Sequence, residues 1–363
     1  MTEFEANYSG LDRMVHNLAM GQFEMQKSLS WIEDRGFDKA HADVTAADPI
    51  FITSLPRAGT TLLLELVAAV PDFASHTYRD IPFLLCPLTW DRVSRRYHKK
   101  AEASERAHGD GVLVSYDSVE AFEEILWRAF WPEHFEPTRI RPWVPEEEDE
   151  DGEFAAFLRQ HMRKIIGLRR RRAGSLAPRR YVSKNNVNIA RLGWLERHFP
   201  DATILIPYRD PMEQIASLMR QHVNFLDAHD KDAFALRYME TIGHLEFGKA
   251  LRPIDFDGCQ ATASDLDPAS ADFWAEYWIV AFGAVLRTAG PRTVVFSYNR
   301  LCAAPGSGLE ALEARIGVKP GALAASAARF HAADRQRPTT DIAQDRARRL
   351  EEVLAQLDDR ALF

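Results

Sequence analysis

A short buried strand that leads directly through a loop into a helix constrains the fold of this chain most strongly. Residues 49–56, PIFITSLP, form a bounded apolar run with β-branched residues, which is typical of a buried strand. The residues that follow, AGTTLLLELVAAV, have the composition of a helix that ends before Pro71. Backbone N–H groups and the helix dipole favour an anion at such a junction. The sequence therefore predicts a phosphate loop at residues 54–61.

The remainder of the chain repeats this alternation of strand and helix. Further strands are predicted around residue 182, at residues 201–208 (DATILIPY) and at residues 293–301 (TVVFSYNRL). Strands separated by helices imply βαβ units. We therefore expect an α/β fold with a central parallel sheet flanked by helices. No clear linker divides the chain, so residues 1–363 are expected to form a single domain.

Two long segments lie outside this alternation. Residues 1–48 carry apolar positions at helical spacing and are expected to form N-terminal helices, and residues 86–180 are expected to form a helical insertion. The insertion holds an acidic run, Glu146–Asp151, and a basic run, Arg169–Arg172. Both runs are most simply solvated surface, although the arginines could instead draw in an anionic ligand. Four aromatic residues could line an apolar cleft or belong to the core: Trp90, Trp127, Phe130 and Trp131.

The residues of the loop suit a phosphate. Gly59 lets the backbone approach the anion, the hydroxyls of Thr60 and Thr61 can donate to its oxygens, and Arg57 adds a forked cationic donor. Compared with the nucleotide-binding pattern GxxxxGK[ST], Ser54 replaces the first glycine and Thr60 replaces the lysine. This disfavours ATP hydrolysis. The loop alone would also fit a kinase relative, a simple anion site or a structural turn.

A second constellation follows the strand at residues 201–208. Arg209 lies at the end of that strand, and Ser217 lies two turns into the next helix. The two side chains could be aimed at one phosphate. The same residues also make a capped helix start, with Asp210 as N-cap, Pro211 at the first position and Glu213 at the third. Capping and ligand binding use different atoms, so both interpretations can hold.

These segments together resemble the sulfotransferases that use 3′-phosphoadenosine 5′-phosphosulfate (PAPS). The segment from Pro49 to Phe73 is similar to their 5′-phosphosulfate-binding segment, in the branch with Pro-Arg-x-Gly-Thr-Thr that includes bacterial enzymes and the tyrosylprotein sulfotransferases. The resemblance covers residues 49–85 and 180–320. It implies a P-loop-containing nucleotide-binding fold and PAPS as co-substrate, without a metal. It also implies a cofactor site that includes the following residues: Pro56, Arg57, Ala58, Gly59, Thr60, Thr61, Arg209 and Ser217.

A third match supplies a candidate catalytic cation. Lys184, in VSKNNVNIARLGW, lies just after a predicted strand, where the similar family segment has a lysine. The resemblance implies that its ammonium stabilises charge on the leaving phosphate or on the sulfuryl oxygens. A surface lysine is the alternative. A general base would take the proton of the acceptor hydroxyl or amine. Transfer would be in line, and positioning and fixed charge would provide most of the acceleration.

The general base is less clearly marked. Family members often place a Glu or His shortly after the phosphate-loop helix, but the matching stretch here, DFASHTYRDIPFLL, contains no Glu. Asp80 is the first candidate, although it could equally cap a helix, and His76 is the second. His134 is an outside candidate for lining the acceptor pocket. Near the C-terminus, Arg335 and Arg337 could contact the 3′-phosphate or simply belong to the surface.

Composition excludes several other classes. A formal net charge of −8 argues against a nucleic-acid partner. The three cysteines, Cys86, Cys259 and Cys302, show neither a disulfide framework nor a metal-ligand spacing, which favours the cytoplasm. No signal peptide or transmembrane segment is expected. The acceptor remains open among small metabolites, lipids, carbohydrates and peptides, as does the oligomeric state. A P-loop kinase or nucleotide phosphohydrolase, and a catalytically silent nucleotide-binding protein, are the alternative functions.

Overall fold

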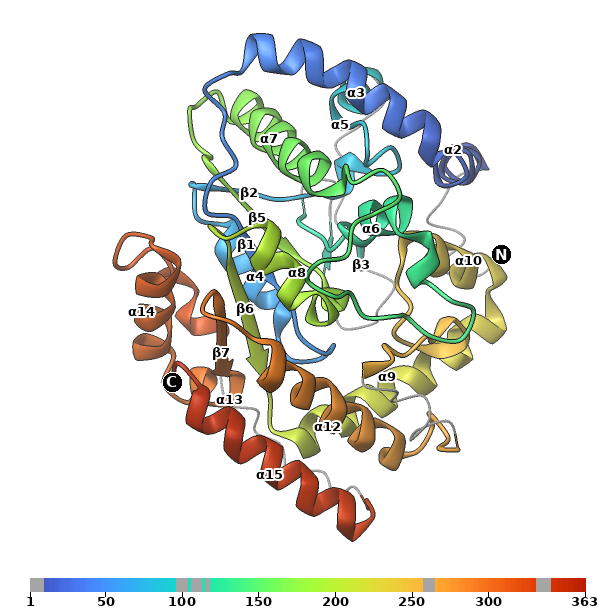
Figure 1. Cartoon of the computed structure of the whole chain (residues 1–363), viewed down its shortest axis with the longest axis vertical. Helices are drawn as coiled ribbons and strands as arrows, with labels where there is room; N and C mark the ends of the chain where they lie inside the picture. The colour runs from blue at the N-terminus through green and yellow to red at the C-terminus, as the bar shows by residue number, and fades with distance from the viewer. Residues whose placement is uncertain (1–9, 96–103, 106–112, 115–117, 257–264, 331–340) are drawn as a thin grey trace.

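A five-stranded sheet forms the centre of the molecule. The computed structural model describes residues 10–95, 104–105, 113–114, 118–256, 265–330 and 341–363. The strands are β1 (Ile50–Ile52), β2 (Phe73–Ala74), β5 (Arg180–Lys184), β6 (Thr203–Tyr208) and β7 (Thr293–Ser297). Their order is β2-β5-β1-β6-β7, and every neighbouring pair is parallel (Figure 1). The predicted α/β fold with a central parallel sheet is confirmed.

The position of β1 explains where a ligand would bind. Although β1 is the first strand in the chain, it lies in the middle of the sheet, between β5 and β6. In open α/β sheets, ligands bind beyond the carboxyl ends of the strands, where the strand order reverses. The loops after β1, β5 and β6 meet at this edge, and they carry the three segments singled out in the sequence.

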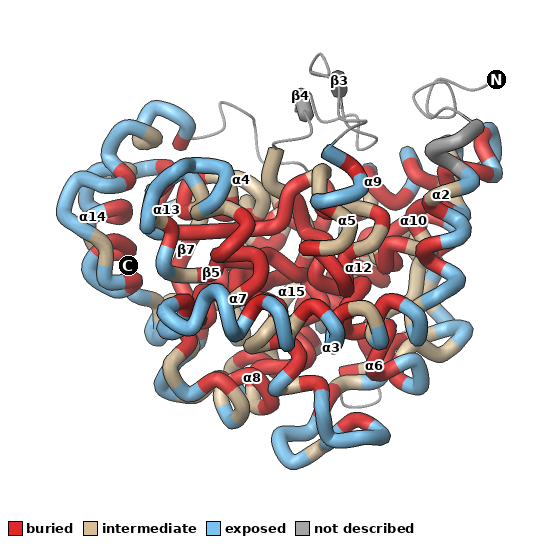
Figure 2. Tube along the Cα trace, turned by 90° about the horizontal axis from the view of Figure 1, so that it is seen from above, coloured by how far each residue is buried: buried red, intermediate tan, exposed pale blue. Residues whose placement is uncertain are grey.

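Both faces of the sheet are covered. Along β1, Phe51 packs into one hydrophobic cluster, while Ile50 and Ile52 pack into another, as the alternation of side chains in a strand requires. The interior is buried throughout (Figure 2). The helices on the Ile50 side include α4 (Thr60–Ala68) and α14 (Pro305–Ile316). The helices that contribute to the Phe51 side include α7 (Phe154–Ala173), α8 (Leu192–His198), α9 (Pro211–Lys231), α12 (Ala271–Thr288) and α15 (Gln344–Arg360).

The two segments outside the sheet are mainly helical. The predicted N-terminal helices are α2 (Gly10–Met20) and α3 (Phe23–Ala40). Residues 86–180 contain α5 (Pro87–Ser94), α6 (Glu124–Phe130) and α7, but also an antiparallel pair, β3 (Ser104–Glu105) and β4 (Leu113–Val114), which the helical expectation missed. Among the described residues, no helix is both long and apolar enough to cross a membrane.

The last strand is shorter than predicted. β7 ends at Ser297, and Tyr298 begins the helix α13 (Tyr298–Ala303) instead of continuing the strand to residue 301. The reason is a cap: the Ser297 hydroxyl accepts a hydrogen bond from the backbone N–H of Arg300, at 3.3 Å. The early turn directs Tyr298 toward the loop after β1.

The basic run Arg169–Arg172 lies at the surface, with Arg171 and Arg172 exposed, but all four arginines form ion pairs. In chain order its four arginines pair with Asp80, Asp43, Asp91 and again Asp91. The run lies at the end of α7, and its partners come from three other parts of the chain. Its charge is thus used to join α7 to the segments packed around it.

Candidate functional site

The loop after β1 has the geometry of an anion cradle. Gly59 is the N-cap of α4, with φ of 85°, and Arg57 also adopts a positive φ, 70°. Left-handed residues turn the chain sharply, so that the loop backbone and the first turn of α4 face the same space. Thr60 and Thr61 are the first residues of α4. Ala58 is fully buried beneath the loop.

Two separate features require glycine at position 59. Its positive φ suits glycine, and a Cβ atom there would lie 2.2 Å from Cε2 of Tyr298. Tyr298 is held at the start of α13 by the cap that ends β7. The tyrosine ring therefore packs directly against the loop backbone, and any side chain at position 59 would displace one or the other.

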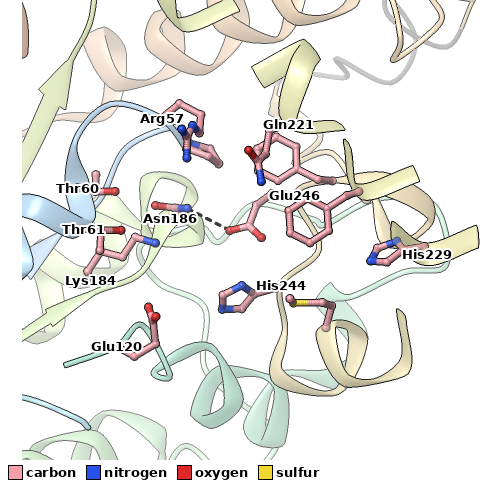
Figure 3. Close-up of a pocket in the computed structure, with 14 residues that line it drawn as sticks. Arg57, Thr60, Thr61, Glu120, Lys184, Asn186, Gln221, His229, His244 and Glu246 are labelled. Atoms are coloured by element: carbon pink, nitrogen blue, oxygen red, sulfur yellow. Dashed lines mark hydrogen bonds between the residues drawn. The ribbon is translucent and has the colours of Figure 1, made fainter. Parts of the chain in front are cut away.

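A pocket opens beside this loop (Figure 3). It encloses about 620 Å³ of space, part of it open to solvent. The lining residues come from the loop and α4, the end of β5, α9, α10 (Ala233–Ile242) and the segment after α10. They are Pro56, Arg57, Thr60, Thr61, Glu120, Lys184, Asn186, Gln221, Phe225, His229, Met239, His244, Glu246 and Phe247.

Lys184 lies where the sequence placed it. It is the last residue of β5, in register with Ile52 of β1, and its side chain is largely buried. Figure 3 shows its ammonium extending past Thr61 toward the middle of the pocket. The next residue, Asn185, ends the strand by capping the following turn, since its side chain accepts from the Val187 N–H, at 3.0 Å. A cation thus stands beside the phosphate loop.

The two predicted phosphate-binding segments meet. Arg57 Nε of the loop donates to Ser217 Oγ of α9, at 3.1 Å, although 160 residues separate them in the chain. Arg209 does not line the pocket; it pairs with Glu213, at 2.9 Å, and its side chain is 24% exposed. The capping interpretation also holds, since Asp210 accepts from the Glu213 N–H, at 3.2 Å.

Asp80, the first candidate for the general base, does not line the pocket. Asp80 is buried outside the lining of the pocket, where it accepts from the Thr77 N–H, at 2.8 Å, and pairs with Arg169. Burial alone would raise the pKa of this carboxyl, but the Arg169 guanidinium and the hydrogen bonds outweigh burial and keep the pKa below its ordinary value. A paired carboxylate of low pKa is a poor proton acceptor. The structure gives Asp80 a capping role, but within the short 3-10 helix Tyr78–Asp80 that it ends, and not at the next helix as the alternative had it.

The second candidate belongs to a buried polar cluster. His76 Nε2 lies 2.8 Å from Nε2 of His161, and its Nδ1 lies 3.3 Å from the Tyr181 hydroxyl. Burial lowers the pKa of His76 to about 4 and holds that of His161 well below its ordinary value. His76 does not line the pocket. Its surroundings are those of a structural histidine.

Acidification is expected to destabilise the protein through this histidine pair. Both pKa values lie below 6.5, the ordinary histidine value, so the folded state binds fewer protons than the unfolded state. The contribution is complete above pH 6.5 and is lost as the pH falls toward 4. Between pH 6.5 and about 5, the free energy of unfolding is expected to fall by roughly 2 kcal/mol through His76. Urea unfolding across this range measures it. The variant His161→Gln should show a weaker pH dependence; identical pH profiles for the two proteins would contradict the prediction.

The other aromatic and basic candidates also lie away from the pocket. Trp127, Phe130 and Trp131 are buried, which confirms the core interpretation. His134 is fully buried, stacks on Trp143 at 4.1 Å between ring centroids, and is not among the lining residues. Arg335 and Arg337 lie outside the described residues, so their contact with the nucleotide stays a prediction.

Several lining residues were not predicted. Glu120, His244 and Glu246 come from segments that show no recognisable pattern in the sequence, and Gln221 lies on the same helix as Ser217. Asn186 did carry a signal, since it stands two residues after Lys184 in the same quoted stretch. Its Nδ2 donates to Glu246 Oε1, at 3.1 Å, across the pocket wall (Figure 3). In the described part of the chain, no group of three or more His, Cys, Asp or Glu could hold a metal ion.

Comparison with known proteins identifies relatives of this arrangement. A family model described as "Sulfotransferase family" matches residues 49–245. Among solved structures, the chain is similar to sulfotransferase STF1 from Mycobacterium tuberculosis H37Rv, with 17% identity, a TM-score of 0.43, and coverage of 91% of this chain and 81% of that chain. It is also similar to sulfotransferase STF9 from Mycobacterium avium, with 14% identity, a TM-score of 0.45, and coverage of 90% of this chain and 80% of that chain. A third similar structure is a sulfotransferase from Alicyclobacillus acidocaldarius, with 13% identity, a TM-score of 0.40, and coverage of 86% of this chain and 95% of that chain. No curated protein matches.

Proposed function

The chain belongs to the sulfotransferase family, and from that premise we propose that it transfers a sulfuryl group from PAPS to an acceptor hydroxyl or amine. The other product is adenosine 3′,5′-bisphosphate. The observation that carries this proposal is the contact between Arg57 and Ser217, at 3.1 Å. This contact joins the loop after β1 to the helix after β6, so that one bisphosphorylated nucleotide can reach both.

The loop would hold the 5′ end of the donor. Arg57, Thr60 and Thr61 line the pocket, and the N-terminus of α4 faces it. Donors of this kind satisfy the oxygens of a phosphate, and the helix dipole adds a favourable potential. Ser217 would contact the 3′-phosphate. Arg209 would join it by exchanging Glu213, its present partner, for the doubly charged phosphate.

Lys184 would act on the transferred group. In the transfer step, a bond forms between the acceptor atom and sulfur, and the bond between sulfur and the bridging phosphate oxygen breaks. The electron pair of the broken bond stays on the phosphate, where negative charge grows. An ammonium fixed beside Thr61 can stabilise that charge without reorganising.

Ligand-induced stabilisation tests this proposal without knowledge of the acceptor. Adenosine 3′,5′-bisphosphate, without Mg²⁺, is expected to raise the unfolding midpoint by several degrees at a concentration near one hundred times its Kd, which corresponds to about 2.7 kcal/mol. ATP with Mg²⁺ should do little, because Thr60 stands where ATP-binding loops have lysine. The variant Ser217→Ala should weaken the effect of the bisphosphate. Stabilisation by ATP with Mg²⁺ and not by the bisphosphate would instead indicate a P-loop kinase or phosphohydrolase.

A further inference from the structure

The wall of the pocket that faces away from the phosphate loop has a distinct chemistry. Phe225, Met239 and Phe247 line it and are each more than 90% buried, so it offers an apolar surface. Two carboxylates also line the pocket: in Figure 3, Glu246 lies across from Lys184, and Glu120 lies below Lys184. The pocket thus has a cationic side at the loop, and the opposite side carries Glu246 and the imidazoles of His229 and His244 beside the apolar residues.

Glu246 is held in place by Asn186. Asn186 is 8% exposed, and its Nδ2 donates to Glu246 Oε1, at 3.1 Å. Because Asn186 follows Lys184 by two residues at the end of β5, this hydrogen bond fixes the carboxylate relative to the ammonium. Within the described residues, the second oxygen of Glu246 has no hydrogen-bond partner, so it can accept a proton or a hydrogen bond from a ligand.

Glu120 is arranged differently. Its Oε2 accepts from the Tyr78 hydroxyl, at 2.9 Å, and its Oε1 accepts from the Ala121 N–H, at 2.8 Å. Both oxygens are therefore already engaged as acceptors. Glu120 contributes negative charge to the wall, whereas Glu246 has an oxygen available for chemistry.

We propose that this wall binds an acceptor with an apolar body and no negative charge, and that Glu246, oriented by Asn186, takes the proton of its reacting group. The inference rests on the proposed sulfuryl transfer. As the acceptor oxygen or nitrogen bonds to sulfur, its proton passes to Glu246, and the electron pair of the broken sulfur–oxygen bond leaves with the phosphate. Glu246 thus gains the proton, and the departing bisphosphate gains the negative charge.

The charges of the wall determine the class of acceptor. Among the described lining residues, the lysine and arginine side chains are Lys184 and Arg57, and both lie on the donor side. An anionic acceptor would place its charge against two carboxylates in a partly desolvated space. A neutral or cationic acceptor avoids this repulsion, and a cation would gain from the same field.

Three small 4-hydroxyphenyl compounds whose side chains differ in charge test the class of acceptor. Tyramine is cationic, 2-(4-hydroxyphenyl)ethanol is neutral and 4-hydroxyphenylacetate is anionic. Calorimetric titration into the protein saturated with adenosine 3′,5′-bisphosphate should show the anionic probe binding at least about tenfold more weakly than tyramine. The variants Glu246→Gln and Glu120→Gln should each narrow that difference. Equal or tighter binding of the anionic probe, or no saturable binding of any probe at millimolar concentration, would overturn the proposal.

The role of Glu246 is tested by the pH dependence of transfer. With the fastest acceptor from a screen with radiolabelled PAPS, Glu246→Gln should lower kcat by roughly 10²–10⁴-fold and remove the acidic limb of the pH–rate profile. Glu120→Gln should keep that limb. A Glu246→Gln protein with the wild-type profile would exclude Glu246 as the base. If the wild-type protein failed to bind adenosine 3′,5′-bisphosphate at all, the proposed function itself would fail, which separates the two results.

Discussion

Replacing Lys184 with methionine is expected to lower kcat for sulfuryl transfer by roughly 10²–10³-fold, the usual effect of removing one donor that stabilises developing charge. Methionine keeps the length and much of the packing of the largely buried side chain but removes the ammonium. Lys184 ends β5 beside Thr60 and Thr61, where the leaving phosphate would gain charge. Single-turnover transfer from radiolabelled PAPS, with an acceptor identified by screening, measures the loss.

The binding of nucleotide provides the contrast for this prediction. Affinity for adenosine 3′,5′-bisphosphate should fall less than tenfold in Lys184→Met, because the loop, α4 and Ser217 remain. Lys184→Arg, which restores a cation of different shape, should recover part of the rate. If binding and transfer fell by the same factor, Lys184 would be a nucleotide-binding residue without a separate catalytic role.

The fold was predictable where its signals are local. The strand, loop and helix at residues 49–68, and the strand at residues 203–208, each show an apolar run next to a turn or a cap. Short elements carry no such signal, so β2 and the β3–β4 pair were missed. The overlong prediction for β7 has a specific cause: the Ser297 cap turns the chain at Tyr298, although the residue types there also suit a strand.

The donor side of the site was more predictable than the acceptor side. A parallel sheet brings the carboxyl ends of its strands to one edge, so the loop, Lys184 and Ser217 could be placed together from their positions in the chain. The prediction for Asp80 could not foresee Arg169, which lies 89 residues away and pairs with it. Glu246 is positioned by its tertiary contact with Asn186, and no sequence pattern reveals such a contact.

A second long-range contact near the site is a buried ion pair. Arg191 is fully buried and binds Glu124 through both Nη atoms, at 2.8 and 2.9 Å. Its guanidinium lies 4.0 Å from the ring centroids of both Trp127 and Trp143. Glu124 also accepts from Asn185 Nδ2, at 2.6 Å, and Asn185 adjoins Lys184. The pair therefore ties the end of β5 to α6.

Replacing Arg191 with methionine is expected to destabilise the protein by ~3–5 kcal/mol, because it leaves the Glu124 carboxylate buried without its cation. Urea unfolding measures the loss. The double variant Arg191→Met with Glu124→Gln removes the stranded charge and keeps a partner for Asn185, so it should recover a large part of the stability. This comparison separates the cost of an unpaired charge from the loss of stacking on the two tryptophans, which both variants share. A single variant within about 1 kcal/mol of wild type would contradict the prediction and would show that the Glu124 carboxylate is stabilised without its cation.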